Sequence, residues 1–188
     1  MVECGAVIIA AGNSTRMGGA PKALLPLLQE SALERLVGLF EGNGVTEIRV
    51  VLGKHSPQIA PLLDHLQIPW VKNASPEKGM FASVQLGVDA LPDKLSAFFI
   101  SPVDLPLIPV ELPRKLMTLQ AETKAPIAAP SINHRRGHPP LFAATLRQEI
   151  LNFSGDGGLR AFQKKYLEAT AWLLIETEEV LLDMDTPE

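Results

Sequence analysis

The sequence contains a single cysteine, Cys4, and no long apolar run. One cysteine excludes a disulfide framework and a cysteine-based zinc site. Because Cys4 lies in an apolar stretch, we expect a small buried residue and not a reactive thiol. No apolar run approaches the roughly 20 residues that a membrane helix needs, and no basic region precedes the first run. We therefore expect neither a signal peptide nor a membrane segment. We expect the protein to be cytoplasmic.

Positive charge is scarce as well, because 17 Lys and Arg are outnumbered by 21 Asp and Glu, for a net charge of −4. This balance gives no reason to expect a nucleic acid or an anionic membrane as a partner. The cations are nevertheless concentrated in two segments. Residues 4–29 contain Arg16 and Lys22 but no acid, and residues 123–148 contain four Lys or Arg but no acid. The acidic balance is therefore compatible with an anion-binding edge built from these two segments.

Hydrophobic residues make up 46% of the 188 residues and charged residues 20%, which excludes a disordered chain. We expect a single domain over residues 1–188. Short apolar runs alternate with segments of helical period, which predicts a three-layer α/β fold whose mostly parallel sheet carries helices on both faces. The expected strands are 7–10, 48–52, 68–71, 97–100, 140–143 and 170–175. One expected helix begins at a capping box of Ser31 and Glu34. A second contains Ile59, a third runs from Met80 to Leu91, and two more lie near Leu146 and Leu159.

The loops after the strands are the candidate binding elements, because ligands of such sheets bind at the carboxyl ends of the strands. We expect four loops, 10–22, 73–80, 101–106 and 183–187, to gather on one edge. The first loop, AAGNSTRMGGAPK, has small residues that let backbone N–H groups approach a phosphate. It matches neither a P-loop nor a dinucleotide-binding fingerprint. From the residues alone, an ordinary strand-to-helix turn explains this loop equally well.

Six segments, in order, resemble the MobA-like nucleotidyltransferases, and in particular the molybdenum cofactor cytidylyltransferases. They are VIIAAGNSTRMGGAPKALLPL (7–27), KGMFASVQLGV (78–88), ISPVDLPLI (100–108), GHPPLF (137–142), GDGGLR (155–160) and DMDTPE (183–188). The first segment is highly specific, and the order of the others supports it. The resemblance implies a Rossmann-like fold of the nucleotide-diphospho-sugar transferase type. It also implies transfer of a nucleoside monophosphate from a nucleoside triphosphate to a phosphorylated acceptor, with Mg²⁺ as cofactor.

The resemblance assigns roles to three groups of residues. The nucleotide would be bound by Ala10, Ala11, Gly12, Ser14, Arg16, Lys22, Gly79, Met80, Ser83 and Asp104. The Mg²⁺ ion would be bound by Asp104, Asp183 and Asp185. The acceptor would be bound by Arg136, His138 and Asp156. Catalysis would rest on Arg16, Lys22 and Asp104, because phosphoryl transfer depends mainly on positioning and charge neutralisation.

Simpler roles stay open for several of these residues. Asp104 also fits a turn before a proline, and Asp156 also fits the N-cap of the helix that follows it. Met80, with Phe81, also fits the core side of a helix. One of the two late acids also fits a solvated charge, and Asp185 is the favoured metal ligand.

The segment NHRRGHPP, residues 133–140, is open in the same way. Its residues alone fit a solvated basic loop. A zinc site at His134 and His138 is not expected, because neither a helix nor a third ligand accompanies them. The resemblance places the segment on the acceptor side, where Arg136 and His138 would meet a phosphate.

Ala11 bears on the choice of nucleotide within the resemblance. Guanylyl enzymes usually show a glycine there, and a methyl group would crowd a purine, so we expect CTP as donor and a molybdopterin phosphate as acceptor. The sequence departs from the family pattern at Leu105, where the cytidylyl branch has an Asp-Gln-Pro type sequence. The family also adds a further acid and a terminal helix beyond the position of Glu188.

Two alternatives accompany this expectation. One is a guanylyl or other transferase of the same family with another phosphate acceptor. The other is a nucleotide-binding homologue without transferase activity. In each case we expect a monomer or weak homo-oligomer that binds a nucleoside triphosphate and a small phosphorylated acceptor, and neither nucleic acid nor membrane.

Overall fold

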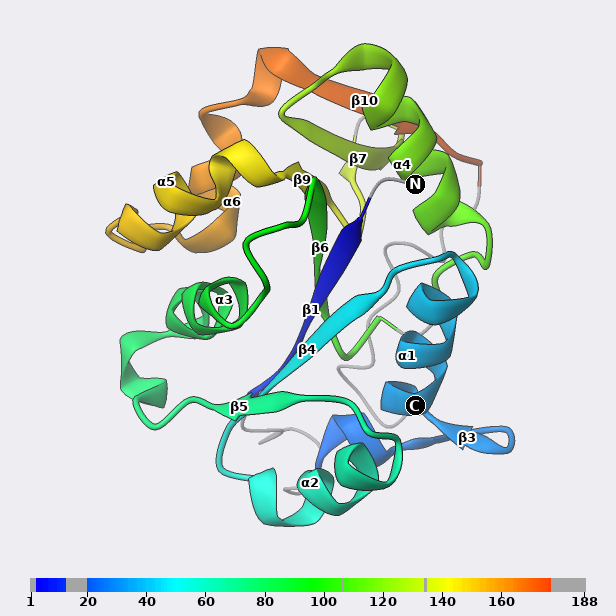
Figure 1. Cartoon of the computed structure of the whole chain (residues 1–188), viewed down its shortest axis with the longest axis vertical. Helices are drawn as coiled ribbons and strands as arrows, with labels where there is room; N and C mark the ends of the chain where they lie inside the picture. The colour runs from blue at the N-terminus through cyan, green and yellow to red at the C-terminus, as the bar shows by residue number, and fades with distance from the viewer. Residues whose placement is uncertain (1–2, 13–19, 106, 134, 177–188) are drawn as a thin grey trace.

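A mixed sheet runs through the centre of the protein in the computed structural model, which describes residues 3–12, 20–105, 107–133 and 135–176 (Figure 1). The strands are β1 (Cys4–Ala10), β4 (Glu47–Leu52), β5 (Trp70–Lys72), β6 (Ala97–Pro102), β7 (Ile127–Ile132), β8 (Arg135–Arg136), β9 (Leu141–Ala143) and β10 (Thr170–Leu174). Their order is β10-β7-β9-β6-β1-β4-β5, and β8 pairs with β7. The β1, β4, β5 and β6 pairs are parallel, as is β10 with β7, whereas β9 runs antiparallel to β6 and β7. The expectation of a mostly parallel sheet is confirmed.

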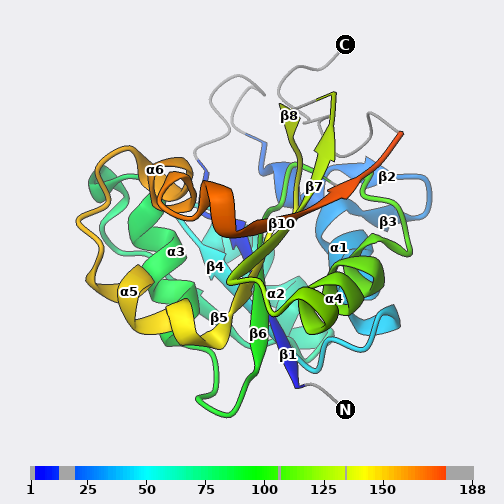
Figure 2. The same ribbon diagram turned by 90° about the horizontal axis from the view of Figure 1, so that it is seen from above.

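Two layers of helices cover this sheet. They are α1 (Ala32–Gly42), α2 (Ser56–His65), α3 (Met80–Asp89), α4 (Leu112–Thr123), α5 (Arg147–Asn152) and α6 (Gly158–Lys164). Figures 1 and 2 show α3, α5 and α6 on one face and α1 and α4 on the other. Strand β1 alternates between the two cores, since Ala6 and Ile8 pack with the α1, α2 and α4 side and Val7 and Ile9 with the α3 side. The three-layer expectation is therefore confirmed.

Local signals in the sequence explain where α1 and α3 begin and end. Ser31 and Glu34 form the expected capping box, with Ser31 N donating to Glu34 Oε2 at 2.7 Å. The expected helix from Met80 ends at Asp89 and not at Leu91, because the proline at 92 disfavours helical backbone at the residue before it. The side chain of Arg147 then donates to the carbonyl oxygens of Asp89, at 3.0 Å, and Leu91, at 2.7 Å.

Helix α4 and strands β7 and β8 were not expected from the sequence. Nor was the small hairpin of β2 (Pro26–Leu27) and β3 (Glu30–Ser31). Strand β7 contains Pro130, which argues against a sheet interior, yet the Pro130 carbonyl still accepts from the Gly137 backbone at 2.9 Å. Cys4 is fully buried in β1, and burial raises the pKa of its thiol to about 12, as expected for an unreactive cysteine. In the part of the chain that the structure describes, no helix is long and apolar enough to cross a membrane.

Candidate functional site

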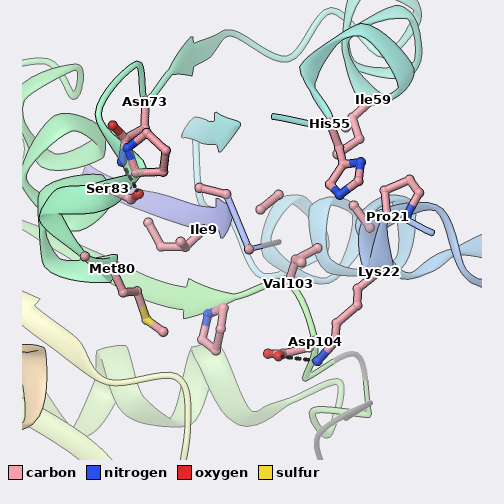
Figure 3. Close-up of a pocket in the computed structure, with 17 residues that line it drawn as sticks. Ile9, Pro21, Lys22, His55, Ile59, Asn73, Met80, Ser83, Val103 and Asp104 are labelled. Carbon is pink, nitrogen blue, oxygen red and sulfur yellow. Dashed lines mark hydrogen bonds and ion pairs between the residues drawn. The ribbon is translucent and has the colours of Figure 1, made fainter. Parts of the chain in front are cut away.

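A cavity of about 390 Å³ opens at the carboxyl ends of β1, β4 and β6 (Figure 3). Residues from four segments line it, within 9–12, 21–23, 73–83 and 102–104. His55 and Ile59, which follow β4, line it as well. Three of the four loops that we expected on one edge therefore meet there. The fourth, 183–187, lies outside the described residues, as do the predicted site residues Ser14, Arg16, Asp183 and Asp185.

One end of the cavity is charged. Lys22 Nζ lies 3.1 Å from Asp104 Oδ2, and the two side chains are 14% and 28% exposed. Lys22 begins the short 3₁₀ helix η2 (Lys22–Leu24), and Asp104 follows β6 by two residues. Val103 N donates to Ile9 O at 3.1 Å, which holds the Asp104 segment against β1. The structure thus brings together two residues, 82 positions apart, that the sequence assigned to one site.

The other end of the cavity is polar but uncharged. Ser83, on α3, and Asn73, directly after β5, are 2% and 7% exposed, and Asn73 Nδ2 donates to Ser83 Oγ at 2.9 Å (Figure 3). Ser83 was a predicted site residue, whereas Asn73 was missed. An asparagine directly after a strand, at the carboxyl edge of a parallel sheet, was the available signal.

The start of α3 forms the wall beside this polar end. Gly79 adopts a φ of 84°, a backbone conformation that residues with a Cβ atom rarely adopt. Gly79 and Met80 both line the cavity. Met80 is 71% exposed, so the alternative that it belongs to the core is wrong. Phe81, at 4% exposure, does belong to the core. The expected contact residues of this segment are therefore placed at the cavity.

The first loop lines the cavity through Ala10, Ala11 and Gly12, and it rests on Gly53 at the end of β4. A Cβ atom built on Gly53 would lie 2.6 Å from Ala11 O and 3.1 Å from Ala11 Cα. Because those atoms are backbone, no side-chain rotation could relieve the clash. Gly53 was not a predicted site residue, although it controls the path of a predicted loop.

Gly53→Ala is expected to weaken nucleotide binding at least about tenfold, because the methyl group must displace the Ala11 backbone, and to cost about 1–3 kcal/mol of stability. Gly38→Ala in α1 is the matched control, since a Cβ atom there meets nothing within 4 Å. Isothermal titration with CTP and thermal melting of both variants measure the two effects. Equal CTP affinity in Gly53→Ala and the unsubstituted protein would contradict the coupling.

His55 and Ile59, at the start of α2, complete the wall and were also missed. His55 Nδ1 lies 3.0 Å from Gln58 Oε1. Figure 3 shows the His55 ring near Pro21, on the Lys22 side of the cavity. No sequence signal marked these residues beyond their position after a parallel strand.

The predicted acceptor residues Arg136, His138 and Asp156 are not among the residues that line the cavity. Arg136 in β8 is in register with Ser131 of β7. His138 lies between β8 and β9, where the Ile100 N–H of β6 donates to Pro140 O at 3.3 Å. Asp156 is exposed and accepts from Ser154 Oγ at 3.2 Å.

Two alternatives for these residues are wrong, the second of them in part. Asp156 does not cap α6, since Gly157 occupies the N-cap with a φ of 73° and no side chain bonds there. The solvated-loop alternative fails for the second half of the segment, since Pro139 and Pro140 are buried and His138 Nδ1 is buried without a hydrogen-bond partner among the described residues, whereas Asn133 and Arg135 are exposed. Burial lowers the pKa of the His138 imidazole, and the nearby negative charge of Asp104 opposes that shift. His138 therefore lies near enough to Asp104 to sense its charge, in a setting where burial disfavours the charged imidazolium.

The described residues contain one element of a Mg²⁺ site. Asp104 presents a carboxylate to the cavity, and carboxylate oxygens are the protein ligands that Mg²⁺ prefers. Nowhere in 3–12, 20–105, 107–133 or 135–176 do three His, Cys, Asp or Glu side chains cluster as a complete metal site. The donor set fits an ion held by one or two carboxylates and the phosphates of a substrate.

Comparison with known sequences identifies a family and a relative of similar length. A family model of the MobA-like NTP transferase domain matches residues 6–170. The chain is 30% identical over 197 residues to nicotine blue oxidoreductase of Paenarthrobacter nicotinovorans, which covers 97% of this chain and 92% of that protein.

Solved structures share the fold at low sequence identity. Rv0371c of Mycobacterium tuberculosis H37Rv superposes with a TM-score of 0.86 at 22% identity over 98% of this chain and 93% of that one, and another structure of Rv0371c is a complex with manganese. A CMP:2-keto-3-deoxy-manno-octonic acid synthetase complexed with CTP has a TM-score of 0.75 at 11% identity, covering 98% and 94% of the two chains. Molybdopterin-guanine dinucleotide biosynthesis protein A of Archaeoglobus fulgidus has a TM-score of 0.68 at 13% identity, covering 97% and 93%.

Proposed function

The chain belongs to the MobA-like NTP transferase family, and we propose that it transfers CMP from CTP to a phosphorylated acceptor, releasing pyrophosphate. The observation that carries this proposal is the polarity of the cavity. Its uncharged end, Asn73 and Ser83, suits a base, and its charged end, Lys22 and Asp104, suits phosphates. The backbone of the first loop also lines the cavity, and we propose that it faces the ribose.

The reaction needs positioning and charge more than proton transfer. An acceptor phosphate oxygen forms a bond to the α-phosphorus of CTP, and the bond from that phosphorus to the bridging oxygen of the β-phosphate breaks. Because the second pKa of a phosphate monoester is about 6, the acceptor is already ionised at neutral pH and needs no general base. Lys22, with Arg16 as a further proposed ligand, would neutralise charge on the triphosphate and on departing pyrophosphate. Mg²⁺ bound beside Asp104 would supply further neutralisation, and Asp185, with Asp183, is proposed to complete its ligands.

We propose a molybdopterin phosphate as the acceptor, with Arg136, His138 and Asp156 on its side of the site. The support is the sequence resemblance to molybdenum cofactor cytidylyltransferases and the position of His138 next to the Asp104 charge. A neutral His138 imidazole can donate one hydrogen bond to the acceptor phosphate, and Arg136 can add charge.

CTP is expected to raise the melting temperature more than GTP, in each case with Mg²⁺. From the family resemblance, a methyl group at Ala11 is expected to crowd a purine base more than a pyrimidine. At 100 times the dissociation constant a bound nucleotide adds about 2.7 kcal/mol of stability, so melting scans over nucleotide concentration separate the two affinities. A larger shift with GTP would overturn the cytidylyl choice in favour of a guanylyl enzyme.

Oxidation and reduction form a second candidate activity, favoured by the nearly full-length similarity to nicotine blue oxidoreductase. The one cysteine of the sequence is buried in β1, so a redox reaction would need an external hydride donor and not a protein thiol. Oxidation of NADH or NADPH with nicotine blue, followed by absorbance, tests this candidate directly.

Pyrophosphate release tests the transferase proposal. The protein is incubated with Mg²⁺ and each of the four ribonucleoside triphosphates, with and without molybdopterin. Release that requires both CTP and molybdopterin supports the proposal. Nucleotide binding without release under any condition would leave a nucleotide-binding homologue, and nicotinamide cofactor oxidation alone would leave the oxidoreductase.

A further inference from the structure

Asn73 is held in a single orientation by its surroundings. Its backbone N–H donates to Leu52 O at 2.8 Å, and its side-chain Oδ1 accepts from Ser75 N at 2.8 Å. A backbone N–H can only donate, so the atom that faces it must be the amide oxygen. The remaining amide atom, which faces Ser83 at 2.9 Å, is therefore the NH₂ group.

This orientation fixes the role of the Ser83 hydroxyl. Ser83 Oγ accepts from Asn73, so its own proton has to point elsewhere. Ser83 lines the cavity and donates to no acceptor among the described residues, although the side chain is only 2% exposed. A buried donor without a partner carries a free-energy cost that a ligand acceptor can remove. The Ser83 hydroxyl thus stands as a donor at the base end of the cavity.

We infer that Asn73 is a positioning residue that makes the site select cytosine over uracil, by keeping the Ser83 hydroxyl a donor to N3 of the base. This inference rests on the proposed function, since it assigns the base of its nucleotide. The 2-carbonyl is an acceptor in both pyrimidines. At N3, however, cytosine presents an acceptor and uracil an N–H, so a fixed donor there pairs with cytosine and opposes uracil.

The substitution Asn73→Asp reverses the hydrogen-bond direction while keeping the shape of the side chain. One carboxylate oxygen still accepts from Ser75 N, and the other must now accept from the Ser83 hydroxyl. The Ser83 oxygen then offers a lone pair to the cavity, which pairs with the N3–H of uracil. The base preference should therefore invert from CTP to UTP.

Equilibrium binding of CTP and UTP, without any acceptor and at pH 8, tests the inference in four proteins. They are the unsubstituted protein, Asn73→Asp, Ser83→Ala and the double variant. The unsubstituted protein should bind CTP about tenfold or more tightly than UTP, and Asn73→Asp should prefer UTP. Ser83→Ala should lose most of the preference for CTP over UTP. Adding Asn73→Asp to Ser83→Ala should leave the ratio of the two affinities unchanged, because the hydroxyl that Asn73→Asp reorients is absent.

The double variant separates hydroxyl direction from charge, because the introduced carboxylate is present with and without Ser83. A CTP-to-UTP ratio unchanged by Asn73→Asp, or changed equally in the Ser83→Ala background, overturns the inference. If Asn73→Asp fails to melt cooperatively, the test rests on Ser83→Ala alone. A CTP-to-UTP ratio in Ser83→Ala equal to that of the unsubstituted protein would then overturn the inference. A protein that prefers CTP yet releases no pyrophosphate with any acceptor would refute the proposed transfer and leave this inference standing.

Discussion

Asp104→Asn is expected to lower pyrophosphate release from CTP about 10³-fold and to leave the melting temperature within about 2 °C. The asparagine keeps the shape of the side chain and removes the negative charge that a divalent ion would need. The stability should change little, because a partly exposed ion pair contributes only about 0–1 kcal/mol. Steady-state pyrophosphate release and thermal melting measure the two quantities.

Asp93→Asn is the matched control for this substitution. Asp93 also forms an ion pair, with Arg147 at 3.1 Å, but its side chain is 99% exposed and lies away from the cavity. The control loses the same charge and one ion pair, and its turnover should stay within about twofold of the unsubstituted protein. Normal turnover in Asp104→Asn would refute the role of this carboxylate in catalysis.

Lys22→Gln is expected to move two measurements in opposite directions. Turnover should fall about 10²-fold or more, because a cation that stabilises the triphosphate and pyrophosphate is lost. The affinity of the nucleotide-free protein for Mn²⁺, read by titration calorimetry, should rise about threefold or more, because Lys22 no longer neutralises Asp104. A substitution that merely disturbed the fold would lower both.

The physical basis is the 3.1 Å contact between Lys22 Nζ and Asp104 Oδ2. Without nucleotide, a divalent ion must compete with the ammonium group for the carboxylate. Triphosphate oxygens can draw the ammonium group away, so nucleotide and metal should strengthen each other's binding, and the coupling must be reciprocal. Lys115→Gln, which breaks an exposed pair with Glu111 at 3.2 Å, is the control and should change neither quantity. Weaker Mn²⁺ binding in Lys22→Gln would contradict the competition.

The sequence sufficed to place Lys22 and Asp104 at one edge because each follows a strand of a parallel sheet, and neighbouring strands end together. The same argument placed the backbone of the first loop, whereas Ser83 was assigned through the family resemblance of its segment. The capping box at Ser31 was readable because its two hydrogen bonds connect residues only three positions apart.

Features that depend on contacts between distant segments could not be read from the sequence. The close approach of Gly53 to Ala11 depends on how the loops after β4 and β1 pack. The bond between Asn73 and Ser83 depends on how α3 docks against the end of β5. Burial of His138 depends on the packing of β9 between β6 and β7, which the sequence pattern around residue 130 did not indicate.

Following the α-phosphate of CTP tests the central claim most directly. The protein is incubated with Mg²⁺, molybdopterin and CTP labelled with ³²P at either the α- or the γ-position, and the products are separated by chromatography. The account predicts that α-label appears in a molybdopterin adduct and γ-label in pyrophosphate, in equal amounts. Both labels remaining in CTP, or γ-label released as orthophosphate without α-label in an adduct, would contradict transfer of CMP to molybdopterin.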